Sequence, residues 1–419
     1  MKLKGNDIAM LSNHYYKKFH VLNLINHHSS ISRTKLSDIT DYRAATISDI
    51  VKELIDEQII VERGSIYAGQ GRRRTLLEIN NDYLCTIGVV IYPPMIEIVI
   101  CSSRGEIWER LSYPFDENWS ANQIIDLVIK SINGLAAKYC SKKILGIGIC
   151  DPGVVAANRE YSVSSVYIKG WKNIRLKSMV EYATKLPVTV SSRVYLTALA
   201  EQKIGLAQGQ SDFICLVLSK GIGLSFVCNN RVVNGHTAMA GQIGHTYVHD
   251  NDKPCYCGNL GCVESSCSLP AIIDKISSAL KSGCNSVLYT FRDHPDAITV
   301  DDIRSAIESH DRLCINVIKH AARLIGIALA NTINILNPQS VIMSGEMVAF
   351  GDEFLSVIIE SAKEHIIPIF NMDIEFVVSN LMDSTLLLGA ATLVYSEFLQ
   401  SDSFFDLYSA TVDDTGTGL

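Results

Sequence analysis

The chain has 419 residues, which is longer than one ordinary domain and predicts two or three folded units. Apolar residues make up 47% of it and charged residues 19%, so an intrinsically disordered protein is excluded. The net charge of −7 is uneven, because residues 1–80 carry 12 basic and 9 acidic side chains while the remainder carries 25 and 35. Since an acidic surface repels DNA, any contact with nucleic acid should be confined to the first 80 residues.

Neither a secretory signal nor a membrane span is expected. The first ten residues contain no long apolar stretch. The most apolar run, at 324–336, contains Asn331 and Asn334 and falls short of a membrane span. Most of the 12 cysteines stand singly in apolar runs, a pattern typical of reduced and buried thiols. We therefore expect a cytoplasmic protein that does not contact a membrane.

The first 80 residues have the pattern of three helices followed by a hairpin. Apolar residues at helical spacing predict helices over 15–26 and 43–58, with a short helix over 32–39 between them. Strands over 59–63 and 75–79 enclose a glycine-containing tip. The third helix begins with small and polar side chains on the face opposite its apolar stripe, and a DNA major groove can admit such a face.

Three consecutive arginines, Arg72, Arg73 and Arg74, stand on the returning arm of this hairpin. Arginines on a flexible arm suit contact with phosphates or insertion into a narrow minor groove. The pattern thus favours a DNA-binding unit. The alternative is a small domain with a solvated basic loop.

From residue 83 onward, strands alternate with helices in two rounds. The first round predicts strands over 85–91, 96–101 and 106–111, a helix over 124–139 and a strand over 144–150. The second begins at Phe213 with three short strands and continues through helix 313–336, strand 341–343, and helices 354–362 and 384–398. This repetition predicts an α/β fold with two lobes, of the actin/hexokinase class, also described as ribonuclease H-like.

Three cysteines and one histidine have the spacing of a metal site. Cys255, Cys257 and Cys262 are separated by glycines that let the chain turn back, and His245 precedes them by a short loop. A set of three cysteines and one histidine is a closed tetrahedral combination typical of structural zinc, with one ion per chain. The alternative, three unligated core cysteines, does not explain the glycines between them.

The stretch C-x-C-G-x-x-G-C-x-E at 255–264 resembles the zinc motif of the ROK family (repressors, open reading frames, kinases). The segment 31–73 is similar to the winged helix-turn-helix of the ROK repressors, and the whole resemblance covers roughly residues 10–395. In the family, the zinc-binding histidine, here His245, also contacts sugar, and Glu264 matches a second sugar-contacting carboxylate. The DNA contacts that the resemblance and the helical pattern imply are Arg33, Tyr42, Arg43, Ala44, Ala45, Thr46, Ser48, Asp49, Arg72, Arg73 and Arg74.

The expected division of the chain follows from the same patterns. Residues 1–80 would form the winged helix-turn-helix, and 81–208 the first lobe, completed by a helix over 384–398. Residues 209–383 would form the second lobe with the zinc loop, and 400–419 a flexible tail.

The residues that a ROK kinase needs for phosphoryl transfer are replaced. The Asp-x-Gly-Gly-Thr loop of the kinases corresponds to 90–94, which ends in two prolines without backbone N–H groups, and the phosphate turns at 219–221 and 344–346 are only partly kept. Counting back from Glu201, the catalytic Asn-Asp pair falls on Ser192 and Arg193. An arginine cannot accept the proton of a sugar hydroxyl, so no kinase activity is expected.

The same comparison implies an effector site at Ser192, Arg193, Gln242, His245 and Glu264. Gln242 replaces a glutamate of the family and can both accept and donate. Arg193 either pairs with a phosphate or carboxylate of the effector or fills a degenerate pocket, and the sequence leaves both open.

These observations predict a repressor of carbohydrate-related genes that senses a sugar or sugar phosphate. Because winged helices bind two-fold symmetric operators, the repressor should be a homo-oligomer, a dimer or a tetramer. Two alternatives stay open: an ATP-dependent sugar kinase with an N-terminal extension, and a ligand-independent DNA-binding regulator controlled by a protein partner.

Overall fold

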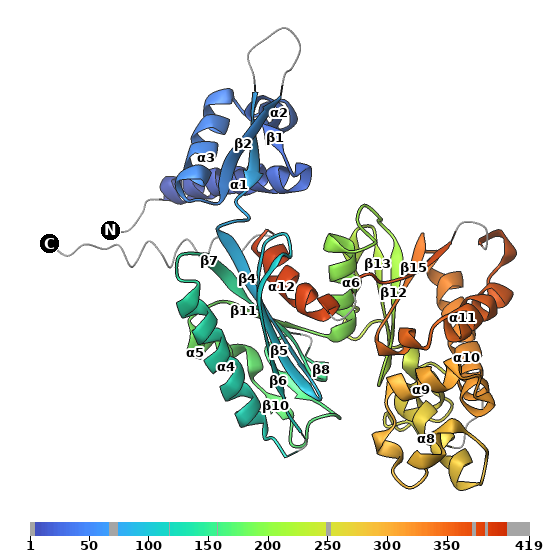
Figure 1. Ribbon diagram of the computed structural model, residues 1–419. Coiled ribbons are helices and arrows are strands. Elements are labelled where there is room, and N and C mark those ends of the chain that lie inside the picture. Colours follow the sequence, from blue (N-terminus) through green and yellow to red (C-terminus); the bar gives the residue numbers. More distant parts are fainter. Residues whose placement is uncertain are drawn as a thin grey trace. The chain divides into compact units, whose positions relative to one another are not determined.

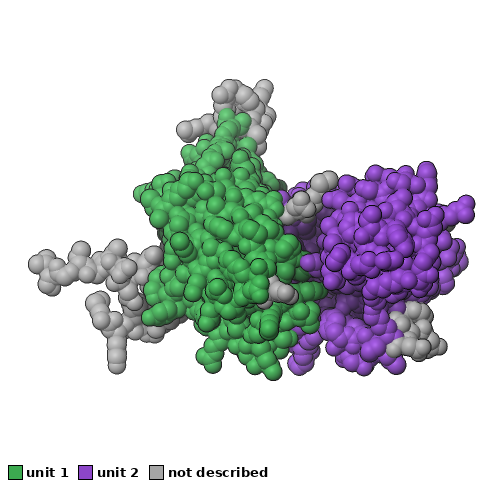
Figure 2. Space-filling view, turned by 60° about the horizontal axis from the view of Figure 1, so that its bottom comes forward, with its two compact units in different colours: residues 1–153, 160–190, 390–419 green, residues 154–159, 191–389 purple. Residues whose placement is uncertain are grey.

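The structure is a computed structural model that describes residues 5–66, 74–116, 118–156, 158–248, 253–370, 374–381 and 384–399. These residues divide into two compact units, coloured separately in Figure 2. Unit 1 comprises 1–153, 160–190 and 390–419, and unit 2 comprises 154–159 and 191–389.

Unit 1 begins with three helices and a small sheet, in the order that the sequence predicts (Figure 1). The first helix is longer than predicted. The second is capped by Ser32, whose side chain accepts from the backbone N–H of Lys35, and it ends at Asp41 in the left-handed conformation, with φ of 55°. The sheet is antiparallel in the order β1-β3-β2. The elements are α1 (Gly5–His28), β1 (Ile31–Ser32), α2 (Arg33–Thr40), α3 (Ala44–Asp56), β2 (Ile60–Ile66) and β3 (Arg74–Ile79).

The rest of unit 1 is built on a five-stranded sheet in the order β11-β7-β4-β5-β6. Strands β4, β5 and β6 form an antiparallel meander, and β7 pairs in parallel with β4. A capping box between Ser120 and Gln123 starts α4, which packs on β5 and beside α5 (Figure 1). The elements are β4 (Leu84–Tyr92), β5 (Met95–Ser102), β6 (Ile107–Pro114), α4 (Ala121–Lys138), β7 (Lys143–Cys150), β9 (Ser162–Ser164), β10 (Lys172–Ile174), α5 (Leu176–Thr184), β11 (Val188–Ser191) and the last nine residues of α12 (Thr385–Phe398).

Unit 2 has a five-stranded sheet, β14-β13-β12-β15-β16, which packs against α6 and against the cluster that contains α8 to α11. Side chains of β12 alternate: Ile214 and Leu216 join the apolar cluster of α8 to α11, while Phe213 and Cys215 join a second cluster with Ala198 of α6. The central strands β12 and β15 are therefore buried on both faces. The elements are β8 (Val154–Val155), α6 (Arg193–Ile204), β12 (Phe213–Leu218), β13 (Ile222–Cys228), β14 (Arg231–Val232), η1 (Ile243–His245), α7 (Val263–Cys267), α8 (Leu269–Lys281), η2 (Val287–Phe291), η3 (Pro295–Ala297), α9 (Val300–Glu308), α10 (Arg312–Leu336), β15 (Ser340–Ser344), η4 (Glu346–Phe350), α11 (Asp352–His365), η5 (Pro368–Phe370) and β16 (Glu375–Val378).

The two five-stranded sheets have the same topology. When the strands of each sheet are numbered along the chain, both sheets have the strand order 3-2-1-4-5. In each sheet the first two strands form an antiparallel hairpin, and the first and fourth strands pair in parallel. The repetition inferred from the sequence is therefore confirmed as an α/β fold made of two related sheets.

Helix α10 corrects one expectation. Over Arg312–Leu336 it is long and apolar enough to cross a membrane, by length and composition. The apolar run expected from the sequence began at residue 324, whereas the apolar helix begins at Arg312. More than half of its most apolar window is buried, and residues such as Ile318, Ile325 and Leu329 are fully buried in the core of unit 2. Burial in that core accounts for its apolar composition.

A single apolar cluster joins the N-terminal helices of unit 1 to the five-stranded sheet. Leu22 and Ile25 of α1 and Ile50 of α3 belong to the same cluster as Leu145 of β7 and Phe398 of α12. All five side chains are buried. Burying a side chain of this size contributes about 1.5–3 kcal/mol, so the cluster is the main attachment between the two parts of the unit.

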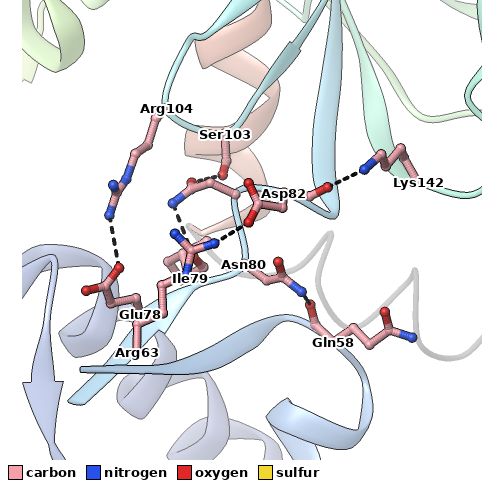
Figure 3. A network of polar contacts seen from close by, with 10 residues as sticks. Gln58, Arg63, Glu78, Ile79, Asn80, Asp82, Ser103, Arg104 and Lys142 are labelled. Atoms are coloured by element: carbon pink, nitrogen blue, oxygen red, sulfur yellow. Dashed lines mark hydrogen bonds and ion pairs between the residues drawn. The ribbon is translucent and has the colours of Figure 1, made fainter. Parts of the chain in front are cut away.

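Polar contacts surround the attachment at the chain segment that connects β3 to β4 (Figure 3). Arg63 pairs with Asp82, and Lys142 Nζ donates to the backbone carbonyl of Asp82 at 2.7 Å. Arg104 Nη2 lies 3.7 Å from Glu78 Oε2. Exposed ion pairs of this kind contribute between about 0 and 1 kcal/mol each, so they orient the segment more than they stabilise it.

The close approach of α12 to β7 leaves no room for a side chain at Gly148. A Cβ on Gly148 would lie 1.8 Å from the carbonyl oxygen of Ala390, which requires a backbone shift, whereas a Cβ on Gly134 in α4 would meet nothing within 4 Å. We predict that Gly148→Ala lowers the melting temperature, because such overpacking costs about 1–3 kcal/mol. Gly134→Ala should leave it unchanged or raise it, since alanine favours a helix by about 0.5–1 kcal/mol. Equal melting temperatures of both variants in a calorimetric scan would contradict the packing of α12 on β7.

Candidate functional site

The predicted DNA-reading helix α3 presents a small-residue face to solvent. Its buried side carries Ile47, Ile50, Val51 and Leu54, which pack in the N-terminal cluster. The remaining predicted base-reading positions are on the other side, where Thr46 is half-buried and the following are exposed: Arg43, Ala44, Ala45, Ser48 and Asp49. Because these side chains are short or flexible, another surface can approach the helix closely.

Two other predicted DNA contacts have intramolecular partners. Arg33 Nη1 lies 2.5 Å from Glu62 Oε1 of β2. The Tyr42 hydroxyl lies 3.1 Å from Nδ1 of His20, and Lys17 Nζ is 5.6 Å from the centre of its ring. Burial, and then the neighbouring Tyr16, raise the pKa of Tyr42. Arg33 and Tyr42 thus help to fix α2 and α3 on their neighbours.

The predicted arginine arm is described only in part. Arg72 and Arg73 lie outside the described residues. Arg74 is the first residue of β3, where its side chain is exposed.

The four predicted metal ligands converge in unit 2. One ligand atom from each of His245, Cys255, Cys257 and Cys262 lies within 4.8 Å of the others. His245 Nδ1 is 3.5 Å from Cys255 Sγ, and Cys257 Sγ is 3.7 Å from Cys262 Sγ. A tetrahedron with metal–sulfur bonds of about 2.3 Å and metal–nitrogen bonds of about 2.0 Å has edges of about 3.5–3.8 Å. These residues therefore can hold a tetrahedral metal ion.

Two glycines give the loop its shape. Gly258 has φ of +92° and Gly261 has φ of +75°, in the left-handed region where a side chain is disfavoured. The backbone N–H of Cys255 donates to the carbonyl of Asn259 at 2.8 Å, and the N–H of Gly258 donates to the carbonyl of Cys255 at 2.9 Å. The loop is thus closed on itself by its own backbone.

The protonation of the three thiols differs within the loop. Burial raises the pKa of Cys255. Burial and a hydrogen bond between Cys262 and Cys257 raise the pKa of Cys262 to about 12. A backbone hydrogen bond at Asn259 lowers the pKa of Cys257. Because a metal ion binds thiolates, it must displace the protons of Cys255 and Cys262, so acid should oppose metal binding.

Two predicted effector residues, His245 and Glu264, are held by neighbouring groups of unit 2. His245 Nε2 is 2.9 Å from the Tyr256 hydroxyl, and the two rings meet edge to face with centres 5.1 Å apart. Glu264 Oε2 accepts from the backbone N–H of Ile222 at 2.8 Å. The carboxylate also packs against Gly244, where a Cβ would lie only 3.1 Å from Oε2. These contacts fix both side chains at the end of β13.

The other predicted effector residues come from neighbouring segments of unit 2. Ser192 is the N-cap of α6 and Arg193 its first residue, and both are half-buried. The start of α6 packs on β13, since a Cβ on Gly223 would lie 2.4 Å from Val194 Cγ1. Gln242 is exposed, and its backbone carbonyl accepts from His245 N at 3.0 Å. Ser192 and Arg193 therefore lie beside the strand end that holds Glu264.

In the turn between β12 and β13, which the sequence predicts to match a phosphate-binding turn of the kinases, a carboxylate accepts the available hydrogen bonds. Glu346 Oε1 accepts from the Ser219 hydroxyl at 2.7 Å and from the backbone N–H of Lys220 at 3.2 Å. A bound phosphate would have to compete for these donors with a negative charge. The sequence shows Glu346 only as a departure from a glycine-rich turn.

Tyr256, Ile222 and Glu346 are the residues of this region that sequence reasoning missed. Tyr256 occupies a position that the metal motif leaves free, and Ile222 contributes only a backbone N–H. Neither role leaves a signal in a single sequence.

The comparisons with known proteins show which family the chain belongs to. The model of the ROK family matches residues 86–397. A xylose repressor from Caldicellulosiruptor bescii is 32% identical over 388 residues, which cover 91% of this chain and 96% of the repressor. A glucokinase from Halalkalibacterium halodurans is 28% identical over 311 residues, which cover 74% of this chain and 94% of the kinase.

Among solved structures, a ROK family transcriptional regulator, a homologue of the E. coli MLC protein, superposes with a TM-score of 0.80 at 26% identity. The superposition covers 92% of this chain and 97% of the regulator. Since the family match takes in well over half of the residues, and the similarity to a repressor extends over nearly all of them, the chain belongs to the ROK family.

Proposed function

We propose that this ROK protein is a transcriptional repressor that binds operator DNA and responds to a carbohydrate. The observation that carries the proposal is the exposed small-residue face of α3, in a region that precedes the ROK match at 86–397. The xylose repressor is similar over 91% of the chain, and the glucokinase over only 74%, which favours the regulator.

In this proposal the first 80 residues form a winged helix-turn-helix. Helix α3 enters the major groove with Arg43, Ala45 and Ser48 toward the base edges, and the arm that ends at Arg74 contacts phosphates. A two-fold symmetric operator requires two such units, so the repressor acts as a homo-oligomer.

The effector binds among Ser192, Arg193, Gln242, His245 and Glu264. The support is that His245 and Glu264 are held at one end of β13 and that the start of α6 packs on that strand. An imidazole N–H and a carboxylate can together bind the hydroxyl groups of a sugar. Arg193 would add a bidentate contact to a phosphate or carboxylate if the effector carries one.

Three features oppose kinase activity. Arg193 stands at the position of the catalytic carboxylate, the turn after β4 consists of Pro93 and Pro94, and Glu346 occupies the donors of the second phosphate turn. A kinase needs a carboxylate to orient the acceptor hydroxyl and free donors to neutralise phosphate charge. We infer that the ROK region binds its ligand without turnover.

The metal ion in the cysteine loop is proposed to be zinc. Three thiolates and an imidazole are the ligands that structural zinc prefers, and two of the ligand spacings, 3.5 and 3.7 Å, fit its bond lengths. The ion would stabilise the loop and fix the ring of His245.

Substitutions in the DNA-binding unit separate phosphate contact from base reading. With DNA selected from a random pool, Arg74→Ala should weaken binding at all sequences and reduce the slope of log K against log salt by about 0.9. Ser48→Ala should change the preferred sequence and leave the slope unchanged. Lys130→Ala, which removes an exposed charge from α4, is the matched control and should do neither. Identical salt slopes and identical selected sequences for all four proteins would exclude this interface.

Removal of one thiol tests the metal site. Cys257→Ser should lose the ion, because a neutral hydroxyl is a poor zinc ligand, and Cys284→Ser should retain it, because that exposed thiol lies outside the cluster. Native mass spectrometry should find one zinc per wild-type chain. A wild-type protein that neither carries zinc nor takes it up on dialysis would contradict the site.

An ATP-coupled assay tests the loss of catalysis. With magnesium, ATP and free xylose or glucose, ADP release should not exceed the rate without sugar, because the phosphate turn is occupied and the orienting carboxylate is missing. A hexokinase measured in parallel provides the positive control. Sugar-dependent ADP release that disappears in Glu264→Ala would show that the chain is a kinase after all.

A further inference from the structure

An open groove of about 530 Å³ lies on unit 1, where β10 leads into α5. Met179 and Tyr182, which are 38% and 79% exposed, stand almost one turn apart on the solvent side of α5. Large apolar side chains exposed together are typical of a surface that another segment covers. The residues that line the groove are Asn173, Ile174, Arg175, Ser178, Met179 and Tyr182.

The surroundings of the groove are basic, although the chain as a whole has a net charge of −7. Residues 172–185 carry four basic side chains and one acidic side chain. Lys172, Arg175 and Lys185 are exposed, and within the described part of the chain none of the three pairs with a carboxylate. Lys185 Nζ lies 4.3 Å from the centre of the Tyr182 ring, which brings a positive charge next to the apolar surface. The groove therefore suits an acidic occupant with large apolar side chains.

The chain contains a segment of this composition at 402–408, outside the described residues. Its sequence, Asp-Ser-Phe-Phe-Asp-Leu-Tyr, has two carboxylates and four large apolar side chains. Residues 400–419 together carry four acidic side chains and no basic one. The match to the ROK family ends at residue 397, before this segment. The charge and the apolar side chains of 402–408 complement those of the groove.

The segment 402–408 starts within reach of the groove. Glu397, near the end of α12, accepts from the Thr189 hydroxyl of β11 at 3.0 Å. The preceding residue of β11, Val188, donates its backbone N–H to Glu181 of α5 at 3.0 Å. Eleven residues of extended chain after Glu397 span up to about 36 Å, whereas the nine residues of α5 are only about 14 Å long. The segment can therefore reach the groove without a shift of α12.

We propose that residues 402–408 dock in the groove beside α5 of the same chain. The aromatic side chains of the segment cover Met179 and Tyr182, which removes apolar surface from water on both partners. Asp402 and Asp406 then lie near the basic side chains around the groove, where opposite charges attract. Because the segment is tethered to α12, its effective concentration at the groove is in the millimolar range, and a weak contact is enough to keep it bound.

Hydrogen exchange followed by mass spectrometry tests the docking on the full chain. The backbone amides of 402–408 should exchange on the order of 10-fold more slowly than in a free synthetic peptide of the same sequence. In Met179→Ser with Tyr182→Ser this protection should be lost, and because both side chains are exposed, the core of unit 1 remains intact. Asp413→Ala with Asp414→Ala, the matched control outside the segment, should keep the protection.

An exchange of charges tests the electrostatic part of the contact. Arg175→Glu with Lys185→Glu should reduce the protection of 402–408 on the order of 3- to 10-fold, because like charges then face each other. Adding Asp402→Lys and Asp406→Lys to the same protein should restore it. Failure of this exchange to restore protection overturns the pairing of the two carboxylates with these basic side chains.

The remaining outcomes decide whether the segment docks and where. Protection that is present in the wild type and lost in the Met179 and Tyr182 variant supports docking in the groove. Exchange of 402–408 at the rate of the free peptide overturns the proposal, as does protection that survives both serine substitutions. Protection that rises with protein concentration, together with a doubled mass in light scattering, overturns docking within one chain and assigns the groove to the segment of a second copy. None of these measurements depends on DNA or carbohydrate, so failure of the proposed function leaves this inference unaffected.

Discussion

The ring of His245 connects two sites, because its two nitrogen atoms face different partners. Nδ1 lies 3.5 Å from Cys255 Sγ among the candidate metal ligands, and Nε2 lies 2.9 Å from the Tyr256 hydroxyl. A metal ion on one nitrogen determines that the other carries the proton. The metal loop therefore does more than stabilise a turn: in the proposed function it decides that the effector side of His245 is a hydrogen-bond donor. Glu264, an acceptor, complements that donor.

The turn between β12 and β13 carries the proposal that the ROK region binds a ligand without turnover. Its backbone N–H groups at Lys220 and Ile222 both donate to carboxylates of the chain, Glu346 in the first case and Glu264 in the second. In a phosphate-binding turn such donors would face an anionic ligand. Here the N–H of Lys220 donates to the carboxylate of Glu346. The N–H of Ile222 orients Glu264, which is proposed to bind the ligand.

Sequence patterns predicted several helices that have one apolar side and missed a helix that is buried all round in its middle. Helix α3 was predicted because Ile47, Ile50 and Leu54 form a stripe opposite polar residues. Helix α6 was not, because every residue from Leu196 to Glu201 is buried and no stripe remains. The metal cluster was predictable because ligand type, spacing and glycines all converge on one geometry. The contact between Tyr256 and His245 was not, because it depends on where the side chain of a loop residue lies.

The packing of the N-terminal helices on the rest of unit 1 could not be predicted from the sequence either, because it depends on segments far apart in the chain. Phe398 of α12 shares a cluster with Ile25 of α1, and the Tyr395 hydroxyl donates to Asn26 Oδ1 at 2.9 Å. Burial raises the pKa of Tyr395, so this hydroxyl remains a donor. The exposed ion pairs of Arg63 and Arg104 are weak beside this apolar contact. Helix α3, which carries the proposed base-reading face, thus packs in the same hydrophobic cluster as the sheet of unit 1. The domain boundary expected at residue 80 lies within the part of the chain that this cluster holds together.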